Sequence, residues 1–69
     1  MTWNYRVVRK NGELGIHEAY YDETGRVHSL SLDPVSNTYD TLPELNTDLE
    51  LMLEGLDDSI INYEDLASE

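Results

Sequence analysis

The sequence predicts an α+β fold, a three-stranded antiparallel β-meander with one C-terminal helix packed on one face of the sheet (β-β-β-α). Three observations predict it. Two runs rich in aromatic and β-branched residues flank an Asn-Gly turn, a third run follows an Asp-Glu-Thr-Gly turn, and a leucine-rich segment repeats at helical spacing. Since 69 residues leave room for one small domain, we expect a single domain over residues 1–63 and a disordered acidic tail over residues 64–69.

The first two strands are predicted over residues 3–10 and 13–21. Asn11-Gly12 between them tolerates positive φ at both central positions of a type I′ turn, the commonest two-residue hairpin link. Such a turn fixes the register of the hairpin. The expected cross-strand pairs are Lys10 with Glu13, Val7 with Ile16, Tyr5 with Glu18 and Trp3 with Tyr20.

The third strand is predicted over residues 26–32. A G1 bulge at Gly25 would pair Asp22 with Arg26, whereas a plain two-residue turn would shift the strand by one residue and put Ser29 and Ser31 on the aromatic face. We favour the bulge because it gathers apolar residues on one side. The predicted core face is Trp3, Tyr5, Val7, Ile16, Glu18, Tyr20, His28, Leu30 and Leu32. The opposite face, which includes Arg6, Val8, Lys10, His17, Ala19 and Tyr21, is expected to lie mostly in solvent.

A loop over residues 33–40 leads to the predicted helix. Thr41 to Glu44 form a capping-box pattern, and Pro43 is tolerated in the first turn because its missing N–H has no helical partner. At about 100° per residue the apolar side chains fall in an arc of about 100°, which is typical of a helix lying on a sheet. These residues are Leu42, Leu45, Leu49, Met52, Leu53 and Leu56, while Leu51 points away. The helix ends at Gly55 or at Asp57-Asp58, and residues 59–63 form a short fourth strand or an extended segment on the core.

The charge divides the chain into two unlike halves. Residues 1–31 hold four basic and four acidic side chains, whereas residues 32–69 hold eleven acids and no base, which accounts for the net charge of −11. Such a chain lacks the basic patch that binding to nucleic-acid phosphates or to an anionic membrane requires. We expect the acidic helix and tail to bind a basic protein surface. The predicted partner-binding residues are Glu44, Asp48, Glu50, Glu54, Asp57 and Asp58.

The predicted location is the cytoplasm. The chain has no cysteine, so a disulfide-stapled secreted scaffold is excluded. No run approaches the roughly 18 to 20 apolar residues that span a bilayer, and the first residues lack the basic-then-apolar layout of a secretory signal.

Glu18 is the residue that most invites a catalytic interpretation, because Tyr5 lies opposite and His28 diagonal to it in the predicted register. The favoured interpretation is a carboxylate at the rim of the core that accepts a hydrogen bond. No nucleophile or phosphate-binding loop accompanies it, so we predict no catalytic residue. His17 and His28 point to opposite faces in this register, so we predict neither a metal site nor a cofactor.

The run from Trp3 to Arg9, followed by Gly-Ile-His-Glu-Ala-Tyr-Tyr-Asp over residues 15–22 and then Gly25, resembles a family of small acidic bacterial proteins of uncharacterised function. The similarity extends over nearly the whole chain, including a proline after the third strand and a leucine-rich helix that ends in an acidic segment. Membership implies the fold and a bacterial, cytoplasmic setting. It implies no activity and no functional residues.

The leading functional prediction is a non-enzymatic protein-binding module that docks its acidic helix and tail on a basic partner. Two alternatives remain open. One is a small homodimer whose sheet faces or edges pair. The other is an inhibitor of phage or host origin whose carboxylates imitate the phosphates of nucleic acid.

Overall fold

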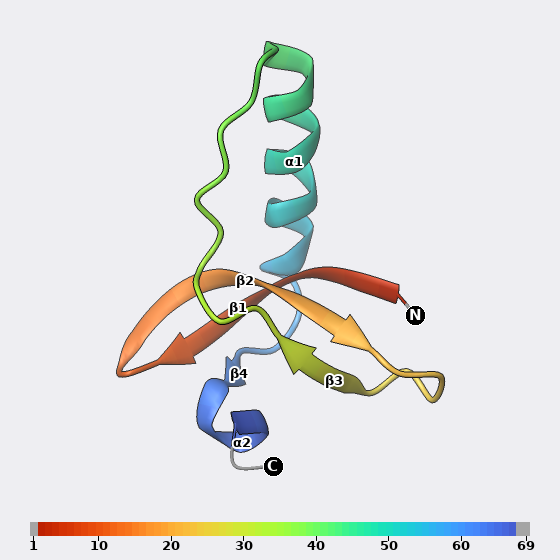
Figure 1. The fold of residues 1–69 in the computed structure, drawn as a ribbon, viewed down its shortest axis with the longest axis vertical. Coiled ribbons are helices and arrows are strands. Elements are labelled where there is room, and N and C mark those ends of the chain that lie inside the picture. Colours follow the sequence, from red (N-terminus) through yellow and green to blue (C-terminus); the bar gives the residue numbers. More distant parts are fainter. Residues whose placement is uncertain (1, 68–69) are drawn as a thin grey trace.

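The computed structural model describes residues 2–67 and has an α+β fold with a four-stranded mixed sheet (Figure 1). The strands are β1 (Thr2–Lys10), β2 (Glu13–Tyr21), β3 (Val27–Leu30) and β4 (Ile61–Asn62), and the helices are α1 (Leu42–Gly55) and α2 (Tyr63–Ala67). The sheet order is β3-β2-β1-β4, with β4 parallel to β1. The α+β class and the short fourth strand are confirmed. The expected β-β-β-α architecture is corrected in two respects. The sheet is mixed because β4 is parallel to β1, and α1 lies in mid-chain and is followed by β4 and α2.

The first hairpin forms as the sequence predicts. Asn11 and Gly12 have φ values of 55° and 79°, as a type I′ turn requires. All four predicted cross-strand pairs occur, from Lys10 opposite Glu13 to Trp3 opposite Tyr20. Residues of one pair share a face of the sheet. We therefore name the two faces after one buried residue on each, the Tyr5 face and the Val8 face.

The predicted register of β3 is wrong beyond its turn. Gly25 has a φ of 84°, and the Asp22 amide donates to the Arg26 carbonyl at 2.9 Å, as the bulged turn requires. A second irregularity between Tyr20 and Tyr21 then shifts the pairing by one residue. Tyr20 faces Ser29 in place of His28, and Ala19 faces Leu30. One extra residue reverses the faces of the strand, so Leu30 joins the Val8 face.

The core lies mainly on the face that we expected to be in solvent. Val8 and Ala19 are fully buried and His17 is 2% exposed, and all three belong to the Val8 face. The segment after α1 covers them, since β4 pairs with β1 and α2 contacts β1 and β3. On the Tyr5 face only Tyr5 itself is buried. The predicted core face is therefore corrected, because the chain has a second covering element that the helix pattern did not reveal.

The expected tail is also corrected in part. Residues 63–67 form α2 on the Val8 face, where the Tyr63 ring lies 6.3 Å from the His17 ring and the Lys10 ammonium lies 4.3 Å from the centre of the Tyr63 ring. A cation over an aromatic face is an attractive arrangement. Residues 68 and 69 of the predicted tail lie outside the described residues.

Candidate functional site

Helix α1 stands on the Tyr5 face and contacts the sheet through its C-terminal end, while its N-terminal end projects away from the sheet (Figure 1). Thr41 caps the far end as predicted, because its hydroxyl accepts a hydrogen bond from the Glu44 amide at 3.4 Å. At the near end Gly55 packs on the backbone of β1. A Cβ atom there would collide with the Tyr5 carbonyl oxygen, so only glycine permits this approach.

Asp48 anchors the middle of α1. The Tyr5 hydroxyl donates to one of its carboxylate oxygens at 2.6 Å, and the Tyr39 hydroxyl donates to the other. Burial and the bond to Asp48 raise the pKa of Tyr5 well above its usual range. Asp48 is one of the six predicted partner-binding residues. It is half-buried and both of its oxygens are engaged within the chain, so it supports the position of α1.

Arg6 holds the segment that follows α1. Its guanidinium donates to the Ser59 carbonyl at 2.8 Å and to the Tyr21 hydroxyl at 3.0 Å, and its Nε lies 3.8 Å from an Asp58 carboxylate oxygen. Asp58 is thus the second predicted partner-binding residue, after Asp48, that has a partner inside the chain. Its side chain is still 50% exposed, so a contact of this length contributes little to stability.

The apolar arc of α1 does not lie on the sheet, contrary to the sequence prediction. Three leucines of α1 and its C-cap residue, Leu56, are more than half exposed, and they fall within about 60° of one another on the helix surface. Met52 is half-buried, whereas Leu45 at the edge of this group is 36% exposed. We call the exposed group the leucine stripe, which comprises Leu42, Leu49, Leu53 and Leu56.

The other predicted partner-binding residues lie on the surface of the molecule. Glu44, Glu50, Glu54 and Asp57 are exposed, and the one hydrogen bond to their side chains among the described residues is from Asn46 to Glu50 at 3.2 Å. The last turn of α1 has no basic residue. Because the C-terminal end of a helix carries partial negative charge, this concentration of acids is unfavourable for the free helix.

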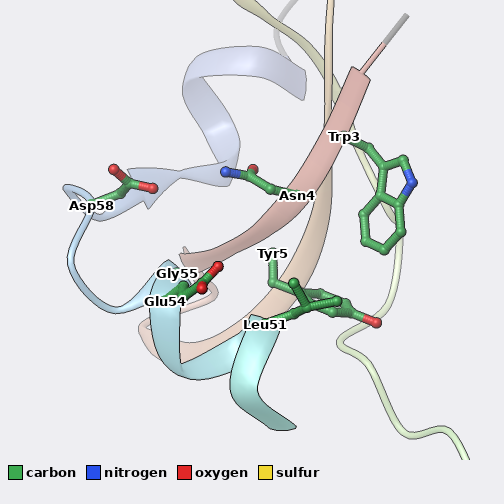
Figure 2. A pocket seen from close by; sticks show the side chains of 7 residues that line it. All are labelled: Trp3, Asn4, Tyr5, Leu51, Glu54, Gly55 and Asp58. Atoms are coloured by element: carbon green, nitrogen blue, oxygen red, sulfur yellow. The ribbon is translucent and has the colours of Figure 1, made fainter. Parts of the chain in front are cut away.

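A pocket of about 240 Å³ lies where α1 meets β1. Figure 2 shows Trp3 on one side of it and Asp58 on the other, with Glu54 and Leu51 of α1 between them. The Trp3 ring stands edge-on to the Tyr5 ring, with 5.2 Å between ring centres. An aromatic wall beside carboxylates can receive an alkyl chain that ends in a cation. No sequence pattern indicates this pocket, because Trp3 and Asp58 are far apart in the chain.

Glu18 and His28 are not brought together as a catalytic pair. Ser29 takes the position opposite Tyr20 that the prediction gave to His28. The Tyr20 hydroxyl donates to a Glu18 carboxylate oxygen at 2.6 Å, and this bond raises the pKa of Tyr20. The donor to Glu18 is thus its near neighbour on β2, whereas Tyr5 or a basic side chain was expected.

His17 is a core residue. Its Nδ1 lies 2.9 Å from the Ser31 carbonyl oxygen, which can only accept, so the ring donates from that nitrogen. Among residues 2–67, no three His, Asp or Glu side chains lie close enough together to hold a metal ion.

Comparisons with known proteins assign no relatives. No family model matches the chain, and no curated protein and no solved structure shows significant similarity to it. The resemblance to small acidic bacterial proteins therefore stays a prediction. Within the described residues no helix is both long enough and apolar enough to cross a membrane.

Proposed function

We propose that this protein is a non-enzymatic binding module that docks α1 on a basic surface of another protein. The observation that carries the proposal is the exposure of the leucine stripe and of four acids in α1 and the turn after it. Large apolar side chains gathered on one exposed surface are typical of interaction sites. Charged side chains around them steer a partner of opposite charge and select against one of like charge.

The distribution of charge supports a basic partner. Residues 42–58 hold six acids and no base, so α1 and the turn after it form a surface of one sign. Two of these acids, Asp48 and Asp58, have partners within the chain. The partner-binding set that we propose is therefore narrower than the predicted one. Its charged members are Glu44, Glu50, Glu54 and Asp57.

A homodimer through the sheet face, the first alternative, is less well supported. The surface expected to pair was that of Arg6, Lys10, His17 and Tyr21. It is the Val8 face, on which α2 packs. The exposed leucines of α1 could still pair two copies. That arrangement would bring two acidic helices together, and like charges at short range oppose it.

An affinity pull-down from a bacterial lysate tests the proposal, with the tagged protein at about 0.05 and about 0.5 M salt. The test variant is Glu50→Lys with Glu54→Lys. The control is Glu13→Lys with Glu23→Lys, since these acids are also exposed but lie at or beside the hairpin turns, outside α1. We expect a basic protein that the wild type and the control retain at low salt and that the α1 variant loses. Retention by the α1 variant at high salt, or recovery of the chain alone, would contradict the proposal.

A further inference from the structure

The spacing of the leucine stripe is that of a helix–helix seam. Leu42, Leu49 and Leu56 lie seven residues apart, and Leu53 lies four residues after Leu49. Apolar residues that repeat in this way form a continuous ridge along a helix, which packs into the groove of a second helix. The 14 residues of α1 give a seam of about 21 Å at 1.5 Å per residue, which is about four turns.

Acids border one side of the stripe, and one of them, Glu54, also lines the pocket beside β1. Glu50 and Glu54 are four residues apart, so they form one row beside the stripe at a separation of one turn. On the other side Asp48 is held by Tyr5 and Tyr39. A helix that covers the stripe would therefore meet two exposed carboxylates along one edge of the contact. Lys or Arg side chains one turn apart would complement them, as in the charged flanks of coiled coils.

A second copy of this chain does not provide that complement. Two of its four basic side chains are engaged on its own Val8 face, since Arg6 binds Ser59 and Tyr21, and Lys10 donates to the Leu32 carbonyl at 2.6 Å. The exposed pair, Arg9 and Arg26, lie in β1 and in the turn before β3. Neither belongs to a helix, so the charged side chains that a second α1 would bring to the seam are all carboxylates.

We infer that the leucine stripe of α1 binds an amphipathic helix of a partner protein, whose Lys or Arg side chains one turn apart pair with Glu50 and Glu54. This rests on the proposed function and adds to it the secondary structure of the partner and the spacing of its charges. The bound helix lies along α1 with its apolar side on the stripe, and the interaction belongs to the helix-in-groove class of recognition.

Three synthetic peptides of about three heptads test the inference. The first has leucines at the seam positions and lysines at the flanking positions. The second has the same composition in scrambled order, so it keeps the charge but loses the seam. The third replaces the lysines with glutamates. Binding to the full chain is measured by fluorescence anisotropy of the labelled peptide, and circular dichroism reports whether the bound peptide is helical.

The test variant is Leu49→Gln with Leu53→Gln, and the matched control is Leu14→Gln with Leu32→Gln, because those leucines are 57% and 66% exposed and lie outside α1. We expect the wild type to bind the lysine-flanked peptide at least about tenfold more tightly than the other two peptides. The control variant should show the same difference in affinity, and the stripe variant should not. All four substituted leucines are exposed, so thermal melts of both variants should match the wild type.

The outcomes separate the inference from the proposed function. Equal, salt-sensitive binding of the lysine-flanked and scrambled peptides would overturn the helix seam and leave a basic partner in place. Equal binding of the lysine-flanked and glutamate-flanked peptides would overturn both the inferred pairing of charges at the seam and the proposed basic partner. Sedimentation of the wild type at twice 7.9 kDa, with the stripe variant at 7.9 kDa, would overturn the inference by making a second copy the occupant.

Discussion

The Val8 face of the sheet and helix α1 both carry apolar side chains, but they are fully buried only on the Val8 face. On the Val8 face the side chains of Val8 and Ala19 are fully buried under the segment that contains β4 and α2. On α1 the four leucines of the stripe are 52% to 75% exposed. The chain thus completes one core by itself and leaves a second apolar surface uncovered. This difference is the reason that the proposed partner contact is assigned to α1.

The charges follow the same division. In the neutral half of the chain Arg6 and Lys10 are fixed by hydrogen bonds to carbonyl groups. In the acidic half most carboxylates of α1 are exposed, and no base lies in the helix. A domain of 69 residues has a free energy of unfolding of about 3 to 10 kcal/mol. Substitutions that change it by about 1 to 3 kcal/mol can therefore test how the two regions differ.

The largest effect is expected at Gly55, where the two regions join. Gly55→Ala puts a Cβ atom 2.9 Å from the Tyr5 carbonyl carbon and closer to its oxygen, so α1 must shift from β1. We expect a loss of about 3 kcal/mol in the free energy of unfolding, measured by urea denaturation. Since alanine is the better helix former by about 1 kcal/mol, a gain in stability would show that α1 does not rest on β1.

Gly25→Ala is the control for that substitution. Nothing lies within 4 Å of a Cβ at Gly25, but its φ of 84° is costly for alanine. We expect a loss of about 1 kcal/mol there, clearly smaller than at Gly55.

Val8 and Leu53 allow a buried and an exposed apolar side chain to be compared directly. Val8→Ala removes two methyl groups from a fully buried position, and we expect it to lower the free energy of unfolding by about 2 kcal/mol. Leu53→Ala removes more atoms, but from a side chain that is 65% exposed, so its effect should stay within about 0.5 kcal/mol. Urea denaturation of both variants measures the contrast, and equal losses would mean that α1 is buried in solution.

What the sequence could predict follows from how local each interaction is. The register of the first hairpin depends on Asn11 and Gly12 and was predicted in full. The choice of core face depends on residues 61–66, which cover β1 from the far end of the chain, and no local pattern indicates that contact. The leucine spacing of α1 indicates an apolar side of the helix. It does not indicate whether the sheet, a partner or solvent lies against that side.

The candidate site was predictable to the same degree. The six acids of residues 42–58 are evident from the sequence alone. Which of them are engaged within the chain depends on tertiary contacts, because Asp48 is bound by Tyr5 and Tyr39, and Asp58 lies beside Arg6. The pocket beside Trp3 likewise exists only once Gly55 brings the end of α1 against β1.

A smaller effect is expected where Asp48 anchors α1. Tyr5→Phe removes the hydroxyl that donates to Asp48, and we expect a loss of about 1.5 kcal/mol in the free energy of unfolding at pH 7. The pKa of Tyr5 is raised above its ordinary value of 10.0 in the folded state. The stability that this hydroxyl provides is therefore complete below pH 10 and decreases as the pH rises further.

Urea denaturation at pH 8 and pH 11 checks this pH dependence. The difference in free energy of unfolding between the wild type and Tyr5→Phe should be smaller at pH 11 than at pH 8. Tyr63→Phe is the control, because its hydroxyl forms no hydrogen bond within the described residues, and at pH 8 it should match the wild type. A difference between wild type and Tyr5→Phe that grows with pH would contradict the assigned role of the hydroxyl.

The smallest effects are expected for one acid from each region, Asp22 in the neutral half and Glu50 in α1. In the neutral half the Asp22 carboxylate accepts from the Thr24 hydroxyl at 2.6 Å and from the Arg26 amide at 3.1 Å, and these bonds lower its pKa below 3.8. Its contribution to stability is therefore present above pH 3.8 and decreases as the pH falls through the folded-state pKa. Asp22→Asn should lower the melting temperature at pH 7 and lose that effect in acid.

Glu50→Gln should act in the opposite direction. It removes one of several like charges from α1 and leaves an amide in its place, so the melting temperature at pH 7 should stay unchanged or rise slightly, most clearly at low salt. Thermal melts of both variants at low and high salt measure the contrast. A lower melting temperature for Glu50→Gln would mean that this acid stabilises the free chain. That result would contradict its proposed role in binding a partner.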